Sequence, residues 1–194
     1  METIVLLLVI LAVNGGIATW NAWLVGRVWP LADGFFTKLL LVCGFVQSGF
    51  GYSSVIIVGL AFGGHTLGYL DQKMVETMFQ LWYVPTILAV IGTGSVIWLH
   101  SVVEFVRNPS AGGFVVGAWN SYAMYHNVSS AIRELPGAID GAGDALASLG
   151  KGKDGAKALV VIVLVAISIG LGFLMTYIVF AYGRARTYAE VEGY

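Results

Sequence analysis

The chain has 194 residues, of which 58% are apolar or aromatic and 11% are charged. Soluble domains carry about 25% charged residues, so this composition excludes an ordinary soluble domain. Ten basic residues against eleven acidic ones give a net charge of −1, which excludes a strongly basic nucleic-acid binder. A single cysteine, Cys43, excludes an intramolecular disulfide framework. The mean hydropathy of +0.83 indicates that lipid is the main solvent.

The apolar residues form four stretches of the length that an α-helix needs to cross a bilayer, about 20 residues. In chain order the predicted spans are 4–25, 39–62, 78–99 and 158–180. We therefore predict an all-α integral membrane protein with four transmembrane helices and an amphipathic helical connector between the third and the fourth. The expected regions are a three-helix membrane region (1–107), the connector (108–157), the fourth transmembrane helix (158–183) and a polar C-terminal tail (184–194).

The connector differs from the spans because it is rich in Gly, Ala, Ser and Asn. Its apolar residues recur at helical spacing on one stripe, which predicts amphipathic helices lying on the membrane or against partner subunits: Phe114, Ala118, Tyr125, Val128, Ile132 and Leu135. Pro136 is expected to end or restart the helix. Residues 111–127 are apolar enough to leave open a fifth crossing or a re-entrant segment, although Asn120 and Ser121 lie in their middle.

The third helix is predicted to extend beyond the bilayer. A helix from Thr77 to Arg107 would be about 46 Å long. Pro109 predicts its end, because the residue before a proline is disfavoured in a helix. His100, Glu104 and Arg107 would then form a juxtamembrane polar cluster on the last two turns.

The basic residues predict an orientation, since they concentrate in cytoplasmic connections. With four crossings, seven fall on one side and three on the other: Arg27, Lys38, Arg107, Arg133, Lys151, Lys153 and Lys157 against Lys73, Arg184 and Arg186. This division places the first and third connections in the cytoplasm and both termini outside. A prokaryotic inner membrane or a viral membrane is the expected location.

Small and polar residues share faces of the first two spans: Asn14 and Asn21 on the first, and Gly44, Gln47, Gly51 and Ser54 on the second. Membrane helices associate through small residues and through amides that bond across the interface, so helix packing is the first interpretation. The second interpretation is a polar solute path lined by Asn14, Asn21, Gln47 and Ser54. The Gly-Thr-Gly-Ser sequence at 92–95 is likewise either a packing face or an unwound, ion-coordinating break.

Several kinds of chemistry lack the residues they need. No Asp, Glu, Lys or Arg lies in the central part of any predicted span, which weighs against an ion-coupled transporter. His65 and His100 lie at opposite ends of their spans, so they do not form a pair of axial haem ligands. We expect no metal and no cofactor. A phosphate-binding loop sequence is also missing.

These features favour a structural role. The first hypothesis is a non-enzymatic integral membrane subunit that helps to build a larger assembly, such as a secretion, respiratory or viral-membrane complex. Its expected partners are the lipid bilayer and other membrane subunits or copies of itself, with no nucleic acid. The alternative is a passive channel or small-solute transporter lined by the Asn14, Asn21, Gln47 and Ser54 faces. A membrane enzyme or cytochrome is the third hypothesis.

Overall fold

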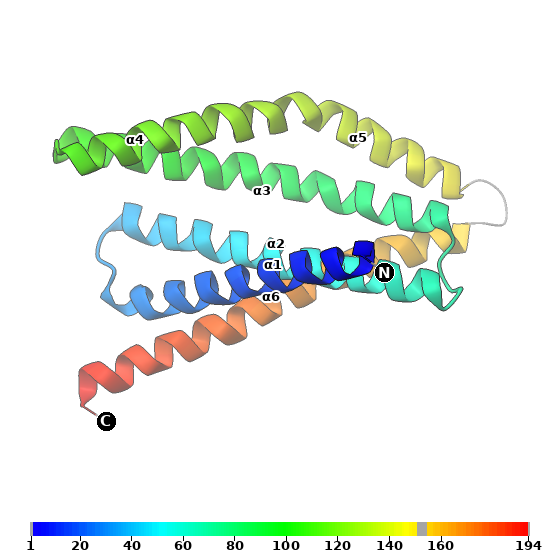
Figure 1. Cartoon of the computed structure of the whole chain (residues 1–194), viewed down its shortest axis with the longest axis horizontal. Coiled ribbons are helices and arrows are strands. Elements are labelled where there is room, and N and C mark those ends of the chain that lie inside the picture. Colours follow the sequence, from blue (N-terminus) through cyan, green and yellow to red (C-terminus); the bar gives the residue numbers. More distant parts are fainter. Residues whose placement is uncertain (1, 151–154, 194) are drawn as a thin grey trace.

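The computed structural model describes residues 2–150 and 155–193, which form helices and the short turns between them (Figure 1). Four of the helices are long and apolar enough to cross a membrane, which confirms the predicted number of spans. These are α1, α2, α3 and α6. The elements in chain order are α1 (Glu2–Val28), the 3₁₀-helix η1 (Trp29–Leu31), α2 (Phe35–Thr66), α3 (Gln72–Arg107), α4 (Ala111–Ala123), the π-helix η2 (Met124–Val128), α5 (Ser129–Gly150) and α6 (Gly155–Glu192).

Helix α3 ends at Arg107, as Pro109 predicts, but it begins five residues earlier than expected. The reason is a cap: the Asp71 side chain accepts a hydrogen bond of 2.9 Å from the backbone N–H of Met74. The helix is continuous through residues 92–95, so the possibility of an unwound break there is wrong.

Helices α1, α2 and α6 pack tightly because glycines allow their backbones to approach. A Cβ atom added at Gly172 of α6 would lie 2.5 Å from the carbonyl oxygen of Gly49 on α2. One added at Gly183 would lie 2.5 Å from the carbonyl oxygen of Trp23 on α1. Such small-residue contacts are the usual way in which membrane helices associate.

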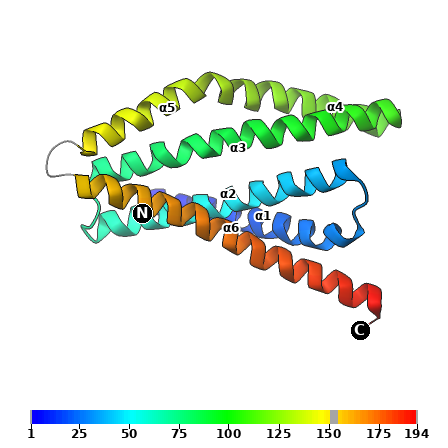
Figure 2. The ribbon, with the colours of Figure 1, turned by 180° about the vertical axis from the view of Figure 1, so that it is seen from behind.

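Residues 111–150 form a long arm, in which α4, η2 and α5 follow one another without a break. Figures 1 and 2 both show the arm beside α3, running in the opposite direction. The sequence predicts amphipathic helices on the membrane or against partner subunits, whereas the arm packs along α3. Leu149 of the arm, for example, lies in one buried cluster with Met74 and Met78 of α3. The predicted apolar stripe is only partly covered by the contact with α3: Val128 is buried, but Phe114, Ala118, Tyr125 and Ile132 are exposed.

Pro136 lies inside α5, so the expectation that it ends or restarts the helix is wrong. The arm bends near its middle (Figures 1 and 2). A π-helix and a proline are both known causes of helix bending, and the arm holds η2 and Pro136 close together.

The bundle has two ends, which we name after residues found there. The Arg27 end holds the α1–α2 and α3–α4 turns and the end of α6; the Asp71 end holds the α2–α3 turn and the beginning of α6 (Figure 1). Arg27 binds Glu190 of α6 at 2.7 Å, and Lys157 binds Asp71 at 3.0 Å.

These contacts overturn the predicted seven-to-three division of basic residues. That division placed Arg27 on the other side of the membrane from the end of the last helix, and Lys157 on the other side from Lys73. In the structure Arg27 bonds α6 near its end, while Lys73 bonds the carbonyl oxygen of Ser148 at the Asp71 end. The arm causes the difference, because it carries the chain back along the bundle before α6 begins. The start of α1 and the end of α6 consequently point to opposite ends (Figure 1).

Candidate functional site

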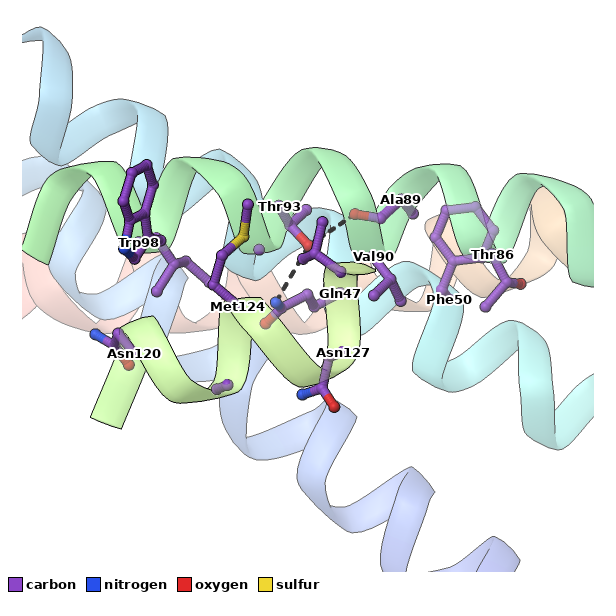
Figure 3. A pocket seen from close by; sticks show the side chains of 14 residues that line it. Gln47, Phe50, Thr86, Ala89, Val90, Thr93, Trp98, Asn120, Met124 and Asn127 are labelled. Carbon is purple, nitrogen blue, oxygen red and sulfur yellow. Dashed lines mark hydrogen bonds between the residues drawn. The ribbon is translucent and has the colours of Figure 1, made fainter. Parts of the chain in front are cut away.

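A groove runs along α3, with α2 as one wall and the arm as the other. It contains a cavity of about 420 Å³ near the middle of the bundle. Figure 3 shows the carboxamide of Gln47 reaching from α2 toward Thr93, with Asn120 and Asn127 of the arm on the opposite wall. We call this feature the amide groove, defined by Gln47, Thr93, Asn120 and Asn127.

Hydrogen bonds hold the floor of the amide groove. Gln47 Nε2 donates to Thr93 Oγ1 at 3.3 Å, and Thr93 Oγ1 donates to the carbonyl oxygen of Ala89 at 2.8 Å. Gln47 and Asn127 are exposed and Asn120 is half-buried. Trp98 lines the cavity, but its indole N–H already donates to Ser121 Oγ at 3.0 Å.

Local features of α3 and the arm place the two asparagines. Asn120 lies on α4 and Asn127 lies within the π-helix η2, and both line the cavity. Gly94 lets the arm approach, because a Cβ atom there would lie 2.8 Å from Cγ2 of Val128. The π-helix η2 spans Met124–Val128 beside this contact. Such helices often occur at functional sites.

A second cleft, of about 410 Å³, lies between α3 and the other flank of the arm. It is lined by the ionisable residues Tyr83, His126 and Glu134. The hydroxyl of Tyr83 donates to the carboxylate of Glu134. The sequence analysis missed this grouping because it treated the arm as a connector on the membrane or against partner subunits and did not pair it with α3.

The six residues predicted to form a packing or pore face do not share one space. Asn21 Nδ2 donates to the carbonyl oxygen of Gly44 at 3.0 Å, and a Cβ atom at Gly51 would lie 2.9 Å from Cβ of Ala18. These residues therefore lie in the contact between α1 and α2. Ser54 bonds the carbonyl oxygen of Gly51 within its own helix.

Two members of that set lie elsewhere. Gln47 faces α3 in the amide groove rather than α1. Asn14 is exposed on α1. A path lined jointly by Asn14, Asn21, Gln47 and Ser54 is not assembled by these contacts.

The predicted juxtamembrane cluster lies at the Arg27 end of α3. His100 and Glu104 line a depression of about 450 Å³. Glu104 accepts a hydrogen bond of 2.9 Å from Nδ2 of Asn108, and Arg107 is exposed. The cluster therefore marks the end of α3, with Asn108 as a member that the sequence analysis did not include.

Within residues 2–150 and 155–193, no three His, Cys, Asp or Glu side chains lie close enough to hold a metal ion. The described chain offers uncharged hydrogen-bonding groups, namely amides and hydroxyls in the middle of an apolar bundle. Compared with protein-family models, curated proteins and solved structures, the chain gave no match.

Proposed function

We propose that the protein is an integral membrane subunit of a larger membrane assembly. In this proposal α1, α2, α3 and α6 cross the bilayer, and the arm crosses it beside α3. The antiparallel packing of the arm along α3 supports this fifth crossing, because a helix that packs along α3 lies at the same depth in the membrane as α3.

The observation that carries the proposal is a charged stripe on the outside of α5, formed by Arg133, Asp140 and Asp144. All three side chains are exposed. They lie opposite the buried residues of α5, among them Ala131 and Ala142, because a helix turns about 100° per residue. Among the described residues, Arg133 bonds only its own helix, through Ser129 and Ser130.

The inner end of this stripe, at Arg133, lies at a depth where lipid is an unsuitable neighbour. The Tyr83–Glu134 bond puts Glu134, and hence Arg133, at the level of Tyr83. Tyr83 lies seven residues, or about 10 Å, along α3 from Glu76. No charged residue follows Glu76 on α3 until Glu104. A charged side chain at the centre of a membrane helix costs about 2.5–3.5 kcal/mol on insertion scales, so such residues face protein or water.

The other half of the arm has the opposite character. The exposed residues of α4 are mostly apolar or aromatic, including Phe114, Val115 and Trp119. This surface suits lipid contact. The proposed interface with other subunits is therefore limited to α5.

Photo-crosslinking in the native membrane tests the proposal. A photoreactive phenylalanine analogue replaces Asp140 in one variant and Val115 of α4 in a matched control. We expect protein adducts from position 140 and only lipid adducts from position 115. Lipid adducts alone from both positions would overturn the assembly. Solute flux through the purified chain in liposomes would instead favour the passive channel.

A further inference from the structure

We propose that the amide groove binds a neutral, membrane-dissolved amphiphile whose head group carries carbonyl or hydroxyl oxygens. This inference depends on the membrane insertion proposed above, but not on the assembly. It assigns a ligand to the cavity between α2, α3 and the arm.

The lining of the cavity determines the charge of the ligand. Its polar side chains are the amides of Gln47, Asn120 and Asn127, the hydroxyls of Thr86 and Thr93, and the indole of Trp98. None of the residues that line it is charged. In an apolar medium an ionic ligand needs an opposite charge, so this groove favours a neutral molecule.

The amides are incompletely satisfied, which indicates that a ligand supplies hydrogen bonds. Across the described residues, these three carboxamides make one hydrogen bond, from Gln47 Nε2 to Thr93 Oγ1. Asn120 and Asn127 can each donate two hydrogen bonds and accept at their oxygen. An unpaired amide in hydrocarbon costs several kcal/mol, and an acyl chain offers no partner. Carbonyl oxygens would accept from the amides, and hydroxyls could also donate to them.

The rest of the groove suits the apolar part of such a molecule. Phe50, Val90, Ile97 and Met124 contribute apolar surface, and the flexible thioether of Met124 adapts to different shapes. A volume of about 420 Å³ lies within the range of small-molecule sites, about 300–1,000 Å³. Because α3 is the floor and α2 and the arm are the walls, the mouth faces away from α3, toward lipid in the proposed orientation.

The experiment measures binding to the full chain in nanodiscs of phosphatidylcholine. The probes are a decyl-substituted benzoquinone, followed by its quenching of tryptophan fluorescence, and dioctanoylglycerol as a competitor. We expect saturable quinone binding. Displacement by dioctanoylglycerol would show that an ester and hydroxyl head also fits, whereas no displacement would restrict the site to quinone-like heads.

The double variant Asn120→Leu, Asn127→Leu tests the role of the amides. We expect it to weaken binding by about tenfold or more, since two hydrogen bonds are lost. Asn14→Leu is the matched control, because it removes an exposed amide outside the groove, and it should stay within about twofold of the wild type. Absence of saturable binding by either probe, or equal affinity in the double variant, would overturn the proposal.

Photolabelling of the wild-type chain with a photoreactive benzoquinone tests the site without a substitution, so a folding defect of a variant cannot affect the result. Labelling should map to Met124 and Trp98, and labelling elsewhere would contradict the site. The outcome is separable from the assembly proposal. Binding without crosslinks at position 140 refutes only the assembly, and crosslinks without binding refute only the groove.

Discussion

At the scale of single residues, amides have different roles according to what they contact. Asn21 bonds the backbone of α2, whereas Asn14 is exposed on the same helix. The sequence groups them because they lie seven residues apart, but spacing alone does not show which of the two faces a neighbouring carbonyl. That depends on the crossing of α1 and α2, which the nearby Gly51–Ala18 contact determines.

Replacing Asn21 with Leu should therefore destabilise the bundle, while Asn14→Leu should not. The expected loss is about 0.6 kcal/mol and at most ~2, the range for hydrogen bonds between membrane helices. Unfolding in a mild detergent titrated with a denaturing one measures the difference. Equal effects of the two variants would contradict the assignment of Asn21 to the α1–α2 contact.

Asp71 gives the fold a dependence on pH. The N–H of Met74, and next the ammonium of Lys157, lower the pKa of its carboxyl below the ordinary value of 3.8. A carboxyl with a lowered pKa stabilises the folded state above its unfolded-state pKa. That contribution disappears as the pH falls through the lowered value.

Two variants separate the two roles of Asp71. Asp71→Asn keeps a capping oxygen but loses the ion pair, so its stability should change less than that of the wild type between neutral pH and about pH 2. Asp71→Ala also loses the cap and should be less stable by about 1 kcal/mol at neutral pH. Thermal unfolding at several pH values measures both effects. An identical pH dependence in the Asn variant and the wild type would show that the carboxyl does not contribute in this way.

At the scale of elements, the spans follow directly from the sequence, and the arm does not. Long apolar stretches identify α1, α2, α3 and α6 because few other structures accommodate them. The amphipathic pattern of α5 is equally clear, but a polar face suits either water or another protein. The sequence therefore does not decide between a helix on the membrane surface and a helix beside α3.

The amide groove shows the same limit. Asn120 and Asn127 stand out in the sequence as polar residues within an apolar stretch, and Gln47 stands out in the second span. Their meeting depends on the arm folding back along α3, a contact between distant parts of the chain. Helical periodicity describes one helix at a time and does not contain this information.

The contact between α2 and α6 gives a prediction about packing. Gly172→Ala puts a methyl group against the backbone of Gly49 and Ser53, which cannot move without separating the helices. We expect a loss of about 1–3 kcal/mol, typical of overpacking. Gly170→Ala on the same helix meets nothing within 4 Å and serves as the control. Similar stability of the two variants would contradict the close approach of α2 and α6.

At the scale of the whole molecule, the arm determines how many times the chain crosses. If the arm lies on the membrane surface, both of its ends are on one side. If it crosses beside α3, Ala111 lies on the side of the Arg27 end and Ala147 on the side of the Asp71 end. Cysteine labelling distinguishes the two arrangements, in a Cys43→Ser background that removes the native thiol.

We expect Ala111→Cys and Ala147→Cys to react with a membrane-impermeant thiol reagent from opposite sides. Two references accompany them, of which only the one in the α2–α3 turn is placed independently of the arm. Glu192→Cys, at the end of α6, should match Ala111→Cys, and Tyr69→Cys, in the α2–α3 turn, should match Ala147→Cys. The reason is chain continuity: after three helices, only a fourth passage through the membrane brings the end of α6 back to the side where α4 begins. Labelling of positions 111 and 147 from the same side would show that the arm lies on the membrane surface. Its charged stripe would then face water, and neither partner subunits nor a lipid-facing groove would be needed.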